Sequence, residues 1–242
     1  MNITLAGYGK MGRMTEAEAI EKGHCIGYII DKGNIQDMQK VNAENTDAVI
    51  EFTEPATAYN NVKFFLEKGL AVVSGTTGWD VPADEFQRIC RQTGAAFLWS
   101  SNFNIGTHLF FMLNRIMAAR SGDLRYKVNI CETHHIHKKD KPSGTAVTLA
   151  QTIIDAHPGY KKWELAEPGE REGVIPIQSV REGEVTGIHQ CIWKSETDTI
   201  ELKHTAHNRK GFAAGAVMAA EFLQGKSGVY HMNDLLNEII RL

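Results

Sequence analysis

The chain has 242 residues, of which 43% are hydrophobic and 23% charged, and its formal net charge is −3. This composition predicts a soluble globular protein with one large domain or two modest ones, each able to bury its own core. The small negative charge gives no global reason to expect nucleic acid or an acidic membrane surface as a partner.

Four cysteines, Cys25, Cys90, Cys131 and Cys191, lie far apart and form no C-x-x-C pair. This spacing predicts free thiols and argues against disulfides or a zinc knuckle. The sequence opens on a strand without a signal-peptide pattern, and no apolar run reaches the ~18 residues of a membrane span. We therefore expect a cytoplasmic protein that binds no membrane.

A nucleotide-binding pattern opens the chain. Asn2–Ala6 is a predicted strand that runs into the motif Gly7-Tyr8-Gly9-Lys10-Met11-Gly12, and a predicted helix continues to about Lys22. In such a G-x-G-x-x-G turn the first glycine permits a tight turn and the second lets a pyrophosphate approach the backbone. The third glycine lets the helix pack close to the strand. The motif therefore predicts a dinucleotide site of the Rossmann type.

The next predicted strand, Cys25–Ile30, ends at an acidic residue. Asp31 follows the glycine motif at the distance where a carboxylate binds the adenosine ribose hydroxyls; the alternative is a solvated acid at a strand end. Lys32 beside it could accept the 2′-phosphate of NADP or be an exposed turn lysine. The sequence therefore leaves NADH and NADPH open as cofactors.

Strands and helices then alternate as in a parallel α/β sheet. The predicted strands are Asp47–Phe52, Leu70–Ser74 and Ala95–Ser100, and the predicted helices between them are Ala56–Lys68 and Asp84–Thr93. Ligands of such sheets bind outside the carboxyl ends of the strands. The segments at these ends are Phe52-Thr53, Gly75-Thr76-Thr77-Gly78 and Ser101-Asn102-Phe103. The second of them would let backbone and hydroxyls approach a carboxamide, although an ordinary glycine turn has the same residues.

After Asn104 the pattern changes. The predicted elements are a helix at Thr107–Ala119, a turn at residues 121–123, a strand at Tyr126–Thr133, a helix at Thr145–Ala156, strands at Ile175–Arg181, Glu184–Trp193 and Thr199–Thr205, and helices at Phe212–Leu223 and Met232–Arg241. The late strands have antiparallel connections, and the last helices are expected to pack on the first domain. The predicted α/β fold thus has a Rossmann-type dinucleotide-binding domain (residues 1–104 and 211–242). The second, α+β domain (residues 105–210) has a mixed, largely antiparallel sheet.

The segment from Glu132 to Ala146 concentrates groups that carry chemistry. It holds His134, His135 and His137, then Lys138, Lys139 and Lys141, and then Pro142-Ser143-Gly144-Thr145 at a predicted helix start. The backbone N–H groups and the dipole at a helix N-terminus bind anions. The segment therefore predicts a site for a small anion that exchanges protons.

Three interpretations of these histidines compete. A metal site needs converging acidic or thiol ligands, but strand alternation sends Cys131 and Glu132 to opposite faces, and the lysines would repel a cation. A solvated basic loop accounts for Lys139 and Lys141 and leaves the helix start unexplained. A catalytic site accounts for both halves of the segment. We favour the catalytic interpretation and expect no metal.

Several motifs together resemble one family. They read H-H-I-H-K-K-D-K-P-S-G-T-A, G-Y-G-K-M-G-R, S-G-T-T-G-W, S-N-F-N-I-G, R-E-G-E-V-T-G-I-H and H-T-A-H-N-R-K-G-F-A-A-G-A. In these motifs and their order the chain is similar to the 4-hydroxy-tetrahydrodipicolinate reductases, also called dihydrodipicolinate reductases, of bacterial lysine biosynthesis. The resemblance spans nearly the whole chain.

The resemblance implies an oxidoreductase with two domains, usually a homotetramer associated through the mixed sheet. It implies hydride transfer from NADH or NADPH to a cyclic dicarboxylate, reducing (2S,4S)-4-hydroxy-2,3,4,5-tetrahydrodipicolinate to (S)-2,3,4,5-tetrahydrodipicolinate on the lysine and diaminopimelate pathway. Two alternative functions are a regulator that senses NAD(P)H without turnover and a dehydrogenase that acts on another imino or keto acid. The pair His134 and Lys138 favours an enzyme over a sensor.

The resemblance also assigns roles by position. Cofactor-binding positions are Gly7, Tyr8, Gly9, Lys10, Met11, Gly12 and Arg13 at the pyrophosphate, Asp31 and Lys32 at the ribose, and Gly75, Thr76, Thr77, Ser100, Ser101, Asn102 and Phe103 on the nicotinamide side. His134 matches the proton donor and acceptor, Lys138 the proton donor, and His135, Gly144 and Thr145 the substrate-binding positions, to which the anion chemistry adds Ser143. His137, Lys139, Lys141, His204 and His207 stay without an assigned role.

Overall fold

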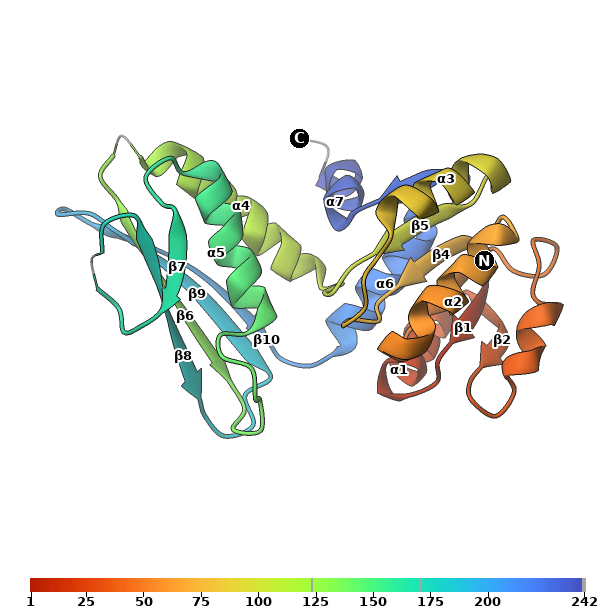
Figure 1. Ribbon diagram of the computed structural model, residues 1–242. Helices are drawn as coiled ribbons and strands as arrows, with labels where there is room; N and C mark the ends of the chain where they lie inside the picture. The colour runs from red at the N-terminus through yellow and green to blue at the C-terminus, as the bar shows by residue number, and fades with distance from the viewer. Residues whose placement is uncertain (123, 170, 241–242) are drawn as a thin grey trace. The chain divides into compact units, whose positions relative to one another are not determined.

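Two compact units make up the chain in the computed structural model, which describes residues 1–122, 124–169 and 171–240 (Figure 1). The first unit contains Met1–Ile105 and the described residues from Lys210 onward, and the second contains Gly106–Arg209. The last residues of the predicted turn at 121–123 and of the predicted helix at 232–241 lie outside the described residues.

A parallel sheet forms the centre of the first unit. Its strands in the described residues are β1 (Asn2–Ala6), β2 (Cys25–Ile30), β3 (Ala48–Glu51), β4 (Ala71–Ser74), β5 (Ala96–Trp99) and β11 (Gly228–Tyr230), in the spatial order β11-β5-β4-β3-β1-β2. Each neighbouring pair runs parallel. The predicted Rossmann-like sheet is therefore confirmed, and its strand ends share one edge.

Helices cover both faces of this sheet. They are α1 (Lys10–Glu21), α2 (Pro55–Glu67), α3 (Ala83–Thr93), α6 (Lys210–Phe222), α7 (Met232–Ile240) and the short 3₁₀ helix η1 (Ile35–Lys40). On one face Leu5 and Ile50 pack with α1, α6 and α7, and on the other Val49 packs with α2 and α3. Strands buried on both faces read as continuous apolar runs, which is why the sequence pattern located them well.

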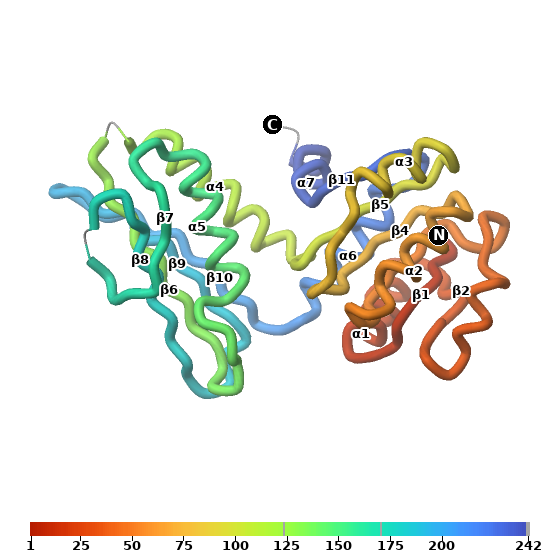
Figure 2. The backbone as a smooth tube through the Cα atoms, in the orientation of Figure 1, coloured from red at the N-terminus to blue at the C-terminus, as the bar shows by residue number. Residues whose placement is uncertain are grey.

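Two strands and one short helix escaped the sequence prediction. The three-residue strand β11 lies parallel beside β5, although some 130 residues separate them along the chain (Figure 2). It is too short to show an alternating pattern. Strand β7 (Lys162–Leu165) lies between the predicted helix at Thr145–Ala156 and the predicted strand at Ile175–Arg181, and η1 follows β2. These elements depend on their neighbours and not on their own sequence.

A mixed sheet forms the centre of the second unit. Its strands in the described residues are β6 (Lys127–His134), β7, β8 (Val174–Arg181), β9 (Gly187–Lys194) and β10 (Thr199–Ala206), in the spatial order β10-β9-β6-β8-β7. The mixed sheet is confirmed. The expectation that antiparallel pairs dominate was wrong for β8, which runs parallel to both β6 and β7. The reason is that α5 (Gly144–Ala156) carries the chain from β6 across one face of the sheet, as a crossover helix does.

Helices α4 (Ile105–Ser121) and α5 pack on one face of the mixed sheet. Trp193, fully buried, donates its Nε1–H to Asn114 on α4 at 3.2 Å. Alternation along β6 places Val128, Ile130, Glu132 and His134 on the buried side, toward the helices. Because successive side chains point to opposite faces, one carboxylate and one imidazole enter the same protected layer.

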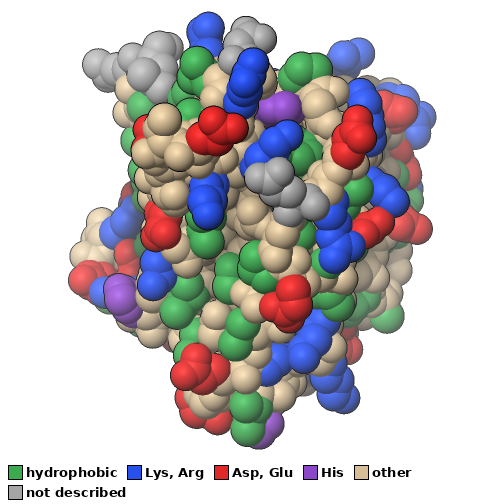
Figure 3. Space-filling model, turned by 90° about the vertical axis from the view of Figure 1, so that its left-hand side faces the viewer, with side chains coloured by type: hydrophobic (Ala, Val, Ile, Leu, Met, Phe, Trp, Pro, Cys, Tyr) green, Lys and Arg blue, Asp and Glu red, His purple; other side chains and the backbone are tan. Residues whose placement is uncertain are grey.

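No helix in the described residues is long and apolar enough to cross a membrane. On the face shown in Figure 3, lysine and arginine side chains are interspersed with aspartate and glutamate. The four cysteines all lie in the described residues and are free thiols, as predicted.

Candidate functional site

The glycine motif adopts the backbone that its sequence requires. Gly7 has φ +93°, and a Cβ placed on it would lie 2.0 Å from the Phe52 carbonyl oxygen. A Cβ on Gly12 would lie 2.2 Å from the Gly7 oxygen, so α1 packs directly on the turn. A Cβ on Gly9 would meet nothing within 4 Å. The middle glycine therefore faces open space at the helix N-terminus, where a pyrophosphate could approach the backbone.

These contacts predict opposite outcomes for two substitutions. Gly7→Ala should lower the free energy of unfolding by about 1–3 kcal/mol, because it forces a Cβ against backbone at a positive φ. Gly9→Ala should leave unfolding unchanged and weaken nucleotide binding instead. Thermal denaturation and nucleotide titration of both proteins test this, with the exposed Gly33→Ala as the control. Equal melting temperatures for the Gly7 and Gly9 variants would contradict the account.

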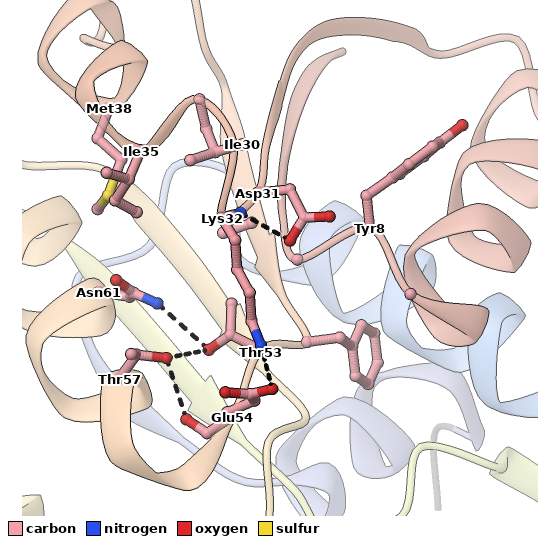
Figure 4. Close-up of a pocket in the computed structure, with 14 residues that line it drawn as sticks. Tyr8, Ile30, Asp31, Lys32, Ile35, Met38, Thr53, Glu54, Thr57 and Asn61 are labelled. Atoms are coloured by element: carbon pink, nitrogen blue, oxygen red, sulfur yellow. Dashed lines mark hydrogen bonds and ion pairs between the residues drawn. The ribbon is translucent and has the colours of Figure 1, made fainter.

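A cavity of about 520 Å³ opens beside the glycine motif (Figure 4). Its lining residues are Ala6, Gly7, Tyr8, Gly9, Ile30, Asp31, Lys32, Ile35, Met38, Phe52, Thr53, Glu54, Thr57 and Asn61. Apolar side chains from β2 and η1 and polar groups from the β3–α2 connection share this lining. Such a mixture suits a ligand with a flat apolar ring and a polar sugar.

At the rim of this cavity lie the charged residues that follow β2 and β3. Asp31 accepts a hydrogen bond from the Lys32 backbone N–H at 2.9 Å, and its own N–H donates to Asn34 Oδ1 at 2.8 Å. The Lys32 ammonium lies 2.6 Å from Glu54 Oε1 (Figure 4). Tyr8 donates to Glu16, and the Arg13 guanidinium lies 4.6 Å from the centre of the Tyr8 ring.

A buried carboxylate organises the ends of β3 and β4. Glu51 is fully buried and accepts hydrogen bonds from Thr53, from Ser74 at 2.5 Å and from Thr76 at 2.7 Å. The Thr76 hydroxyl also accepts the Thr53 N–H at 2.8 Å. The Thr76 side chain is thereby tied inside the protein, while Thr77 is exposed.

The remaining predicted cofactor positions lie after β4 and β5. A Cβ on Gly75 would overlap the Phe52 ring, which therefore rests against this glycine. Ser100 donates to the Asn102 carbonyl at 2.6 Å and Ser101 is exposed. Phe103 is 2% exposed and packs in the core with Phe52. Its side chain serves packing, so only its backbone is available for the predicted ligand contact.

In the second unit, His134 at the end of β6 is held by a charged pair. Its Nδ1 is hydrogen-bonded to Glu132, whose other oxygen accepts from Arg181 Nη1 at 2.9 Å. Both Glu132 and His134 are buried. Burial alone would raise the pKa of Glu132, but hydrogen bonds from His134 and Arg181 lower it to about 2. Glu132 is therefore an anion that orients the imidazole, leaving Nε2 as its free nitrogen.

Arg181 also fixes the loop that carries Lys138. Its Nε donates to the Lys138 carbonyl at 3.2 Å and its Nη2 to the Asp140 carbonyl at 2.5 Å. The Lys138 ammonium lies 2.9 Å from Asp140 Oδ2. Burial opposes ionisation of Asp140, and the hydrogen bond from Lys138 outweighs it and lowers its pKa. One arginine thus positions both predicted proton donors.

Helix α5 begins beside this pair with a capped N-terminus. Ser143 is buried and accepts the Ala146 N–H at 3.3 Å, and its hydroxyl lies 3.1 Å from His189 Nε2 on β9. Burial, aided by the charge of His134, lowers the pKa of His189 to about 3, so His189 is neutral at pH 7. His135 has a buried Nδ1 without a hydrogen-bond partner among the described residues.

Glu132, His134 and His189 also have the ligand types of a metal site, with ligand atoms within 4.8 Å of one another. Both Glu132 oxygens already accept hydrogen bonds, and the Arg181 cation lies at 2.9 Å. A positive charge at this distance opposes a second cation. The charge of Arg181 therefore disfavours a metal ion at this cluster.

Residues left without a role by the sequence lie mostly at the surface. His137 is exposed and lies 3.4 Å from Glu184, and Lys139 and Lys141 are exposed. His204 packs beside Phe110, and burial lowers its pKa; His207 is exposed.

The structure brings together most residues predicted for each site. Gly7, Tyr8, Gly9, Asp31 and Lys32 line one cavity, while Lys10, Met11 and Gly12 form the first turn of α1 beside it. In the second unit His134 and Lys138 are joined through Glu132 and Arg181, and Ser143 contacts His189, whose ring centre lies 5.1 Å from that of His134. Gly144 and Thr145 lie in the first turn of α5.

Sequence reasoning missed three members of that second network. Glu132 was considered only as a metal ligand. Arg181 and His189 were included only as the ends of the motif R-E-G-E-V-T-G-I-H, without a role of their own. Alternation on β6 already puts Glu132 on the side of His134. Arg181 and His189 required the strand register, which places them opposite His134 and Glu132.

Comparison with known proteins gives a consistent result for both units. The family model described as "Dihydrodipicolinate reductase, N-terminus" matches residues 1–103, and "Dihydrodipicolinate reductase, C-terminus" matches residues 106–236. A 4-hydroxy-tetrahydrodipicolinate reductase of Christiangramia forsetii is 40% identical over 242 residues, covering 100% of both chains. One from Ralstonia pickettii is 34% identical, covering 98% of this chain and 99% of its own.

A solved structure supports the fold. The dipicolinate-bound dihydrodipicolinate reductase from Paenisporosarcina sp. TG-14 superposes with a TM-score of 0.78 at 23% identity, covering 96% of this chain and 97% of its own. Its low identity makes it a statement about fold alone. The two family models and the full-length relatives decide the matter: the chain belongs to the dihydrodipicolinate reductase family, as its motifs predicted.

Proposed function

We propose that this protein is a 4-hydroxy-tetrahydrodipicolinate reductase. It uses NADH or NADPH and one proton to convert (2S,4S)-4-hydroxy-2,3,4,5-tetrahydrodipicolinate to (S)-2,3,4,5-tetrahydrodipicolinate in lysine and diaminopimelate biosynthesis, and the 4-hydroxyl group leaves as water. The observation that carries the proposal is the network in which Glu132 and Arg181 orient His134 and the Lys138 loop beside the capped start of α5. A protein that only senses the nucleotide has no use for this network.

The first unit is the dinucleotide-binding domain in this proposal. A nicotinamide dinucleotide fits it, because Gly9 leaves open space at the start of α1 and the cavity beside it has about 520 Å³. The Gly7–Gly12 turn with Arg13 would hold the pyrophosphate, Asp31 the ribose, and the segments after β4 and β5 the nicotinamide side. When bound, the cofactor supplies a hydride.

The second unit supplies the proton that the reduction also consumes. Loss of the 4-hydroxyl group as water gives the ring a C=C bond conjugated with its imine. Hydride addition to this conjugated ring leaves negative charge on nitrogen, which a nearby ammonium or imidazolium neutralises by giving up a proton. Lys138 is the proton donor, and His134 gives and takes protons at Nε2 while Glu132 holds Nδ1.

The start of α5 is the proposed carboxylate cradle. Substrate carboxylates need oriented donors and positive charge. Gly144 and Thr145 lie in the first turn of α5, whose backbone N–H groups and dipole attract anions. His135 adds a buried Nδ1 that has no partner among the described residues. Ser143 caps the helix and keeps this turn in place.

Assembly and location belong to the same proposal. We expect a homotetramer that associates through the mixed sheet, in the cytoplasm. On β6 the side chains that point away from α4 and α5, such as Asn129 and Cys131, are half-buried. A strand face of this kind suits an interface between copies of the chain.

The ribose role of Asp31 gives a prediction. Asp31→Ser should weaken NADH binding more than NADPH binding, because a carboxylate binds the ribose hydroxyls and repels a 2′-phosphate. Fluorescence titration of the reduced nucleotides measures both affinities. Equal losses for the two nucleotides would remove Asp31 from the ribose site.

Oxidation of the reduced nicotinamide cofactor in the presence of substrate tests the function directly. The protein should oxidise NADH or NADPH, followed by absorbance, when supplied with freshly generated product of the preceding synthase. Tight nucleotide binding without oxidation would favour the sensor. Oxidation only with another imino or keto acid would favour the rival dehydrogenase.

A further inference from the structure

The lining of the nucleotide cavity includes two carboxylates and one lysine ammonium group. Its lining includes Asp31 after β2, Lys32 beside it, and Glu54 immediately before α2. Resting on the proposed function, we infer that Glu54 is a specificity-determining residue that makes this cavity select NADH over NADPH. Figure 4 shows the Asp31, Lys32 and Glu54 side chains, and the role of Glu54 is separate from the ribose role of Asp31.

The backbone at Glu54 is fixed while its side chain is left to face Lys32. Its carbonyl accepts the N–H groups of Thr57 and Ala58, each at 3.0 Å, at the start of α2. Its carboxylate forms no cap on that helix and instead lies 2.6 Å from the Lys32 ammonium. The pair therefore spans the rim between the ends of β2 and β3.

Lys32 is the lining residue that could bind a 2′-phosphate, and Glu54 already neutralises it. The hydrogen bond from Lys32 to Glu54 raises the pKa of Lys32, which keeps the ammonium charged and paired. Asp31, on the other side, contributes a second carboxylate. Together the three side chains carry a net charge of about −1 at pH 7.

The two cofactors respond differently to this charge. The 2′-phosphate of NADPH brings a charge of about −1.5 to −2, whereas NADH has a hydroxyl at the same position. An exposed ion pair is weak, so a phosphate could draw Lys32 away. Glu54 would then remain as an unpaired anion beside the phosphate. The selectivity therefore comes from the charge of Glu54 and not from the strength of its bond to Lys32.

The position of Glu54 strengthens this effect. A helix N-terminus favours anions, and α2, with Pro55 at its first turn, begins next to the cavity. Glu54 places a fixed carboxylate at that end of the helix. With a neutral residue at position 54, a 2′-phosphate could interact with both the N-terminus of α2 and the Lys32 ammonium.

Nucleotide binding by the substrate-free protein tests the inference. The unaltered protein should bind NADH more tightly than NADPH. Glu54→Gln, which keeps the shape and removes the charge, should tighten NADPH binding about tenfold, the effect of one nearby charge, and change NADH binding little. Adding Lys32→Met to Glu54→Gln should abolish most of that gain. Glu67→Gln, an exposed charge change later on α2 and outside the cavity lining, is the control.

The outcomes separate this inference from the proposed function. Equal affinities in the unaltered protein, or equal changes for both nucleotides in Glu54→Gln, overturn the inference and leave the reductase intact. If Glu54→Gln selectively tightens NADPH binding but the unaltered protein does not turn over the substrate, the inference is supported and the proposed reaction is overturned. Binding of neither nucleotide overturns both.

Discussion

Replacing Lys138 by alanine should lower kcat about 100-fold or more, the usual contribution of a positioned proton donor. The Lys138 ammonium is placed by Asp140 at 2.9 Å, and its backbone is held by Arg181. Because Lys138 belongs to the second unit, nucleotide affinity should stay close to that of the unaltered protein. Steady-state kinetics together with nucleotide titration measure both effects.

The neighbouring lysine provides a matched control. Lys139→Ala removes the same group one residue later, from an exposed side chain, and should leave kcat nearly unchanged. If Lys138→Ala retained a normal kcat, the proton-donor role would be refuted. If both variants lost activity alike, the loop would act through its overall charge and not through one placed donor.

Replacing Glu132 by alanine should lower the free energy of unfolding by about 3–5 kcal/mol, because it leaves a buried cation without its partner. Arg181 and His134 both lose the carboxylate that they share. The same change should lower kcat, since His134 is no longer oriented. Urea denaturation and steady-state kinetics measure the two losses. The control is Glu184→Ala, which removes an exposed carboxylate beside His137.

The low pKa of Glu132 adds a pH dependence. A carboxyl group whose pKa falls from 4.5 to about 2 on folding stabilises the protein above its unfolded-state pKa. That contribution should be lost as the pH falls from about 4.5 toward 2. In Glu132→Ala the unfolding free energy should therefore depend less on pH in this window. An unchanged stability and an unchanged acid dependence would contradict the buried ion pair.

The sequence predicted the longer apolar strands better than the short strands, for a physical reason. Strands β1 and β2 are largely apolar runs, and the structure confirms the predicted bounds of both to the residue. The glycine motif also predicts its own geometry, since Gly7 and Gly12 have no room for a side chain. By contrast β7 and β11 form only because a neighbouring strand offers hydrogen bonds, and short segments carry no such signal.

The candidate site divides in the same way. His134, Lys138 and Ser143 come from one continuous segment, so a local motif could identify them. Arg181 and His189 reach the site through pairing of β6 with β8 and β9, which depends on register. Register is set by tertiary packing and cannot be read from one strand. That is why sequence reasoning named the proposed proton donors and missed the groups that hold them.

The central claim is hydride transfer from the nicotinamide to the cyclic dicarboxylate, and isotope transfer tests it most directly. The protein would be given reduced nicotinamide dinucleotide deuterated at both C4 positions, with substrate generated by the preceding synthase. The account predicts tetrahydrodipicolinate that carries one deuterium, detected by mass spectrometry, and oxidised cofactor in equal amount. Oxidised cofactor with unlabelled product, or no reduced product at all, would contradict it.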